Sequence, residues 1–153
     1  MTNNDILRRI RYTFDLSDSQ MIAIFSQADH EVTREEISDW LKKDDDPAFK
    51  ECSDTRMAIF LNGFINKRRG KREGAQPKPE TRLNNNIIFT KLKIALNLKA
   101  EEIIELLALA GFHIGKHELS AFFRRPDHKH YRECKDQILR NFLKGVQIKF
   151  RQD

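Results

Sequence analysis

The sequence has little of what marks exported, membrane-spanning or catalytic proteins. It holds two cysteines in 153 residues, and since no export signal begins the chain, we expect reduced thiols and no disulfide framework. No apolar run approaches the roughly 20 residues that span a bilayer. Neither a glycine-rich phosphate loop nor a Gly-x-Ser-x-Gly nucleophile motif occurs. These absences predict a cytoplasmic protein with no membrane contact, no cofactor and no enzymatic activity.

What the sequence does contain is an internal repeat. A shift of 82 positions aligns residues 3–69 with residues 85–151 without a gap. Hydrophobic residues make up 39% of the chain, enough for each copy to bury a core. Residues 70–82 have two glycines, two prolines and no large apolar side chain, which is typical of a linker. The sequence thus predicts a first helical repeat over 1–69, a basic Gly/Pro linker over 70–82 and a second helical repeat over 83–153.

Apolar residues recur at helical spacing in both copies, and no stretch alternates as a strand does. We therefore predict an all-α fold of two tandem, homologous four-helix domains. A single core of fewer than about 70 residues is marginally stable, so the copies are expected to pack with pseudo-twofold symmetry. The second and third helices of each copy are predicted to form a helix-turn-helix-like pair. In the first copy the helices are expected to begin at Asn3 or Asn4, at a capping box on Ser17, at a capping box on Thr33 and near Ser53.

The repeated motifs are specific enough to compare with known families. Both copies carry NN-x-I near their start, and both carry E-C-x-D and then FL-x-G in the region of the last helix. With this duplicated pattern the whole chain resembles the YehS-like family of bacterial proteins. The resemblance implies a tandemly duplicated domain of unknown function, and it brings no established activity or catalytic residue.

Positive charge is concentrated outside the first copy. Residues 1–69 have 11 Lys and Arg against 13 Asp and Glu, residues 70–82 have 4 against 2, and residues 83–153 have 13 against 8. The net charges are therefore −2, +2 and +5, and a polyanion is expected to dock on the linker and the second copy, where Lys129 and Arg132 add to the charge. The candidate nucleic-acid-binding residues are Arg68, Arg69, Lys71, Arg72, Lys116, His117, Ser120, Arg124 and Arg125.

A non-enzymatic binding or adaptor protein is the function that this pattern favours, with either nucleic acid or another protein as the partner. The basic residues also fit a second interpretation, in which they only solvate helix surfaces and the protein is a protein–protein interaction module. Binding of nucleic acid predicts that charge reversal at Arg124 and Arg125 weakens affinity for all sequences.

Two further groups of residues have the elements of reactive sites. Cys52 and Cys134 begin the fourth helix of each copy, where a helix dipole favours a thiolate, so a thiol-based redox sensor or enzyme is the third alternative. Small buried packing residues are the favoured interpretation of both thiols. The second copy also holds a histidine-rich group without a known zinc-binding spacing, and no metal site is predicted for it. Its members are His113, His117, His128, His130 and Cys134.

Overall fold

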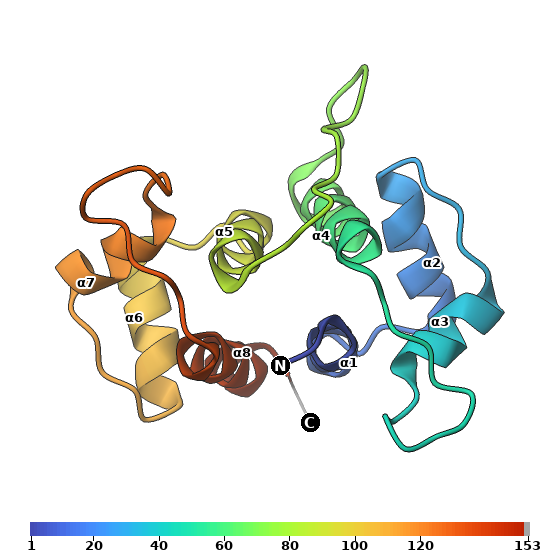
Figure 1. Cartoon of the computed structure of the whole chain (residues 1–153), viewed down its shortest axis with the longest axis horizontal. Coiled ribbons are helices and arrows are strands. Elements are labelled where there is room, and N and C mark those ends of the chain that lie inside the picture. Colours follow the sequence, from blue (N-terminus) through green and yellow to red (C-terminus); the bar gives the residue numbers. More distant parts are fainter. Residues whose placement is uncertain (152–153) are drawn as a thin grey trace. The chain divides into compact units, whose positions relative to one another are not determined.

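Every regular element of the computed structural model, which describes residues 1–151, is a helix. The chain divides into two compact units, Met1–Leu83 and Asn84–Asp153, coloured blue to green and yellow-green to red in Figure 1. Each unit has the same order of four α-helices, and the predicted all-α fold is confirmed. The helices are α1 (Asn3–Thr13), α2 (Asp18–Gln27), α3 (Arg34–Leu41) and α4 (Asp54–Arg69), then α5 (Asn85–Ala95), α6 (Ala100–Leu109), α7 (Lys116–Ser120) with the 3₁₀-helix η1 (Ala121–Phe123), and α8 (Asp136–Phe150).

Local capping patterns begin α2 and α3 as the sequence predicts. The side chains of Ser17 and Thr33 each accept a hydrogen bond from the third backbone amide of their helix, and both capping boxes are complete. The predicted cap of α1 is wrong by one or two residues, because Thr2 is the capping residue and Asn3 and Asn4 lie inside the helix. In the second unit Asn84 caps α5 in the same way.

The core of each unit lies where α2 crosses α4, or α6 crosses α8. A Cβ atom at Gly63 would lie 1.9 Å from the carbonyl oxygen of Ile24, and one at Gly145 would lie 1.9 Å from that of Leu106. The repeated glycine therefore permits the close helix crossing in both units. Equivalent positions fill the two cores with buried side chains: Ile6, Ile10, Phe25, Ile37, Trp40 and Phe60 in the first unit, and Ile88, Leu92, Leu107, Leu119, Phe122 and Phe142 in the second.

The segment after α4 belongs to the first unit and has no helix between residues 70 and 82. Gly70 follows the helix with a positive φ of 97°, a backbone conformation that glycine adopts at little cost. The Asn66 amide donates to the Gln76 side chain at 2.8 Å, and the Leu83 backbone amide donates to Asp54 at 2.9 Å. These bonds fasten the middle of the basic segment and the residue that follows it to α4.

Candidate anion-binding site

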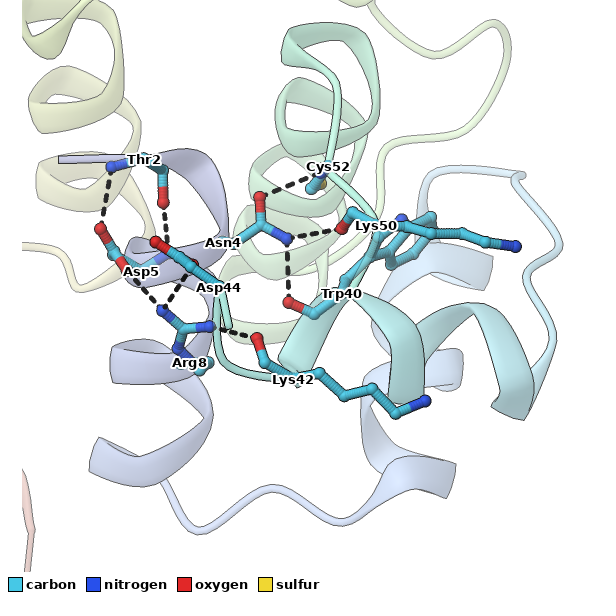
Figure 2. A network of polar contacts seen from close by, with 9 residues as sticks. All are labelled: Thr2, Asn4, Asp5, Arg8, Trp40, Lys42, Asp44, Lys50 and Cys52. Carbon is cyan, nitrogen blue, oxygen red and sulfur yellow. Dashed lines mark hydrogen bonds and ion pairs between the residues drawn. The ribbon is translucent and has the colours of Figure 1, made fainter. Parts of the chain in front are cut away.

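The repeated second asparagine fastens a long loop in each unit. Figure 2 shows Asn4 of α1, whose amide group donates to the carbonyl oxygens of Trp40 and Lys50, each at 2.9 Å, and whose oxygen accepts from the Cys52 amide at 3.0 Å. We call this set of three bonds the asparagine clasp. In the second unit Asn86 makes the same clasp to Phe122, Arg132 and Cys134, at 3.0, 2.8 and 2.9 Å.

The repeated first asparagine fastens the start of the fourth helix. Asn3 donates to the Cys52 carbonyl oxygen at 3.0 Å and to the Asp54 carboxylate at 2.8 Å. Asn85 makes the equivalent bonds to Cys134 and Asp136, at 2.9 and 2.7 Å. The NN motif and the C-x-D motif thus have a structural role: their hydrogen bonds hold the loop in place.

The two cysteines are buried behind these clasps. Cys52 is 4% exposed and Cys134 is 1% exposed, and burial raises the pKa of each thiol to about 12. Since the thiolate is the reactive form, burial outweighs the helix dipole that would favour it. Both side chains therefore have the character of packing residues.

The predicted basic residues of the first unit lie at the end of α4 and just after it. Arg68 and Arg69 close the helix, and Lys71 and Arg72 follow it. The Arg68 guanidinium lies 5.1 Å from the ring centre of Phe14, and burial lowers its pKa. Lys71 forms an ion pair with Asp29 at the end of α2. Arg68 and Lys71 are thus engaged within their own unit.

The predicted residues of the second unit lie on α7 and on the segment that follows η1. Lys116 binds Glu101 of α6 at 2.9 Å, and this hydrogen bond raises the pKa of the lysine. The Ser120 hydroxyl donates to the carbonyl oxygen of His117 at 2.7 Å. Arg125 lies 3.5 Å from the Asp127 carboxylate and is 86% exposed. The nine predicted residues therefore divide between the two units, four in the first and five in the second.

A pocket of about 260 Å³ lies in the second unit, between α7 with η1 and the loop that follows. His117 and Arg124 of the predicted set line it. Sequence reasoning placed Lys129 and Arg132 among the basic residues but did not assign them to a site, and the fold brings them to Arg124. The full lining consists of His117, Glu118, Ala121, Arg124, Lys129, His130, Tyr131 and Arg132.

Arg124 is the central cation of this pocket. One of its terminal nitrogens lies 3.5 Å from the Ser120 hydroxyl, and the other lies 3.5 Å from a ring nitrogen of His128. Its Nε atom is buried and makes no hydrogen bond to any described residue. Because contacts of 3.5 Å are weak hydrogen bonds, the two terminal nitrogens are suited to a stronger acceptor brought by a ligand.

Residues 1–151 contain neither a group of metal ligands nor a helix that could span a membrane. No three His, Cys, Asp or Glu side chains in this range are grouped so that they would hold a metal ion. No helix in this range has both the length and the apolar composition to cross a membrane. The basic pocket of the second unit is lined by three cationic side chains, which suit it to the binding of an anion.

Comparisons with known proteins agree with the duplicated architecture. A family model described as "Protein of unknown function (DUF1456)" matches residues 3–70 and again residues 85–152. The uncharacterized protein YehS of Escherichia coli (strain K12) is 43% identical over 147 residues, which cover 95% of this chain and 94% of that protein. No solved structure matches the chain. The predicted tandem duplication and the resemblance to the YehS-like family are confirmed.

Proposed function

Because the chain belongs to the DUF1456 family of proteins of unknown function, we propose its function from its own residues: a non-enzymatic, cytoplasmic binding protein whose second unit binds nucleic acid. The supporting observation is that two units with the same order of helices carry opposite charge. Residues 1–69 have a net charge of −2 and residues 83–153 a net charge of +5. Since the shared fold does not require this difference, the positive charge is available for a polyanion.

The proposed contacts are with the phosphate backbone. Lys116 and Arg125 are both exposed on the second unit. Lys116 is the first residue of α7, and Arg125 follows η1. Such side chains bind phosphates irrespective of sequence, and their contribution falls as salt is added. The predicted helix-turn-helix-like pair plays no part in this proposal, because α7 has only five residues and residues 110–115 make a longer connection than the usual three to four.

Fluorescence anisotropy with labelled duplex DNA, single-stranded DNA and RNA, at about 50 and about 200 mM salt, tests the proposal. We expect binding at the lower salt that weakens steeply at the higher. Replacing Arg125→Glu is expected to weaken binding of all three probes and to reduce the dependence of log affinity on log salt by about 1.

Lys43→Glu is the matched control, since Lys43 is exposed at the equivalent position of the first unit. It makes the same change in net charge and is expected to leave binding nearly unchanged. Equal weakening by the two variants would show that the second unit is not the binding surface. No binding at low salt would refute the function itself and favour a protein partner.

A further inference from the structure

We propose that the pocket of the second unit binds one phosphate group, in the place that a built-in carboxylate occupies in the first unit. The pocket brings together three cationic side chains, Arg124, Lys129 and Arg132, and one carboxylate, Glu118. Among the described residues, no carboxylate forms an ion pair with any of the three cations. The pocket therefore holds an excess of positive charge for a ligand to neutralise.

The first unit shows what this position looks like when it is filled. Asp39, near the end of α3, is buried, and its carboxylate lies 2.7 Å from Lys42 and 3.5 Å from Lys50. The hydrogen bond from Lys42 lowers the pKa of Asp39, which keeps the carboxylate ionised. One internal anion thus bridges two cations that lie at opposite ends of the loop.

The second unit retains both cations and lacks the anion. The repeat aligns Lys42 with Arg124 and Lys50 with Arg132, and it aligns Asp39 with Ala121. The loop returns to the same carbonyl oxygen in both units, because the amide of Arg132 donates to the carbonyl oxygen of Ala121 at 3.2 Å, as the amide of Lys50 does to that of Asp39 at 3.3 Å. Exchange of a carboxylate for a methyl group leaves space beside two arginines.

The charge of the lining favours phosphate over a carboxylate ligand. A phosphate ester carries about −1.5 to −2 charges at neutral pH, which matches three cations opposed by one carboxylate. Arginine binds phosphate oxygens through two parallel hydrogen bonds. The two terminal nitrogens of Arg124 make only long contacts of 3.5 Å within the protein, so they are suited to donate to a phosphate. His117 and His130 also line the pocket.

The size of the pocket limits the ligand. A volume of about 260 Å³ lies below the usual range for drug-sized ligands and suits one phosphate with little attached to it. The phosphate belongs either to a small phosphate ester or to the end of a nucleic-acid strand. This inference does not rest on the proposed function, because it concerns a single phosphate group, and the proposed backbone contacts Arg125 and Lys116 do not line the pocket.

The test is a titration of the full chain with inorganic phosphate at constant ionic strength, followed by amide chemical shifts in a two-dimensional NMR spectrum. We expect saturable shifts confined to residues 117–132. Acetate, which carries one charge, is expected to bind at least about tenfold more weakly. Diffuse shifts without saturation, or equal binding of acetate, would overturn the proposal.

The variant Ala121→Asp restores the carboxylate that the first unit has. Because an internal carboxylate competes at a high effective concentration, we expect phosphate affinity to fall by more than about tenfold. The first unit accepts an aspartate here, so the variant is expected to fold. Lys144→Gln, an exposed change on α8 with the same effect on net charge, is the matched control and is expected to bind phosphate normally. Phosphate binding by Ala121→Asp equal to that of the wild type would refute the site.

A second variant and a second probe complete the test. Arg132→Gln is expected to weaken phosphate binding at least about tenfold without adding a carboxylate, and unchanged binding would again refute the site. Oligonucleotides with a 5′-phosphate or a 5′-hydroxyl group then identify the source of the phosphate. Tighter binding of the phosphorylated strand, lost in Ala121→Asp, assigns the pocket to a strand end, and equal binding of the two strands assigns it to a small phosphate ester.

Discussion

The loop after the third helix is fastened by charged side chains in the first unit in a way that the second unit does not repeat. Arg8 of α1 donates to the carbonyl oxygen of Lys42, forms an ion pair with Asp5 and lies 3.9 Å from Asp44 (Figure 2). The equivalent of Arg8 in the second unit is Thr90, whose hydroxyl donates to a backbone oxygen of its own helix at 2.8 Å. The contacts that Arg8 makes with the loop thus have no counterpart at Thr90, the equivalent residue of the second unit.

The neutral contacts, in contrast, are the same in both units, since each unit keeps the asparagine clasp with nearly the same distances. Buried hydrogen bonds to backbone groups are costly to lose, whereas ion pairs near the surface contribute little to stability. After duplication, the charged contacts can therefore change with little loss of stability, whereas a change in the clasp destabilises the unit. The fold therefore needs the clasp in both units, and the charged residues can differ between the units and serve function.

The largest expected effect concerns a property that the two units share. With pKa values of about 12, Cys52 and Cys134 are expected to react with a disulfide reagent at pH 8 about 10²-fold more slowly than thiols in unfolded protein, because the smaller thiolate fraction outweighs the higher nucleophilicity of a more basic thiolate. The measurement is the rate of labelling, with each cysteine identified by peptide mapping. Rapid labelling of only one cysteine would break the equivalence of the units and revive the redox hypothesis for that unit.

Removal of the clasp is expected to have the next largest effect. Asn4→Ala leaves the Cys52 amide and two carbonyl oxygens of the first unit without partners, which lowers the free energy of unfolding by about 2 kcal/mol. Asn86→Ala is expected to cost the second unit the same. Fluorescence of Trp40, the one tryptophan of the chain, follows urea unfolding of the first unit, and circular dichroism follows both. A clear difference between the two losses would show that the clasps are not equivalent.

Local patterns explain which parts of the fold the sequence could predict. The capping boxes at Ser17 and Thr33 involve partners three residues away, so their pattern is visible in a short stretch of sequence. The asparagines of the NN motif were misassigned as caps because their true partners lie 36 to 51 residues further along the chain. Their polar side chains are compatible with a cap, and only the tertiary fold shows where their hydrogen bonds go.

The sequence did not predict the pocket, because its lining residues come together only in the tertiary fold. Arg124 and Arg132 lie at opposite ends of a loop, and the charge pattern alone does not show that they meet. The alignment of the repeats contained a usable signal, because two aligned pairs of cations accompany the exchange of Asp39 for Ala121. The second copy keeps both cations and has lost the carboxylate of Asp39, and this loss indicates an anion-binding site.

The smallest expected effect tests the carboxylate that distinguishes the units. The hydrogen bond from Lys42 holds the pKa of Asp39 below its ordinary value. The carboxylate therefore stabilises the first unit above the pKa of the unfolded chain, and this contribution is lost as the pH falls through the lower pKa of the folded protein. Asp39→Asn is expected to reduce stability at pH 7 by less than loss of the clasp. The difference from the wild type is expected to shrink as the pH falls below about 4 and to vanish only below the lowered pKa of Asp39 in the folded protein.

Urea unfolding followed by Trp40 fluorescence between pH 7 and pH 3 measures this difference. Asp45→Asn removes an equal charge from an exposed position of the same loop and is expected to leave stability unchanged, which separates the ion pairs of Asp39 from net charge. A loss for Asp39→Asn that persists unchanged at pH 3 would mean that packing, and not the ionised carboxylate, stabilises the loop. The first unit would then no longer be a model for an anion bound in the second, since the two cations would not need a charged partner between them.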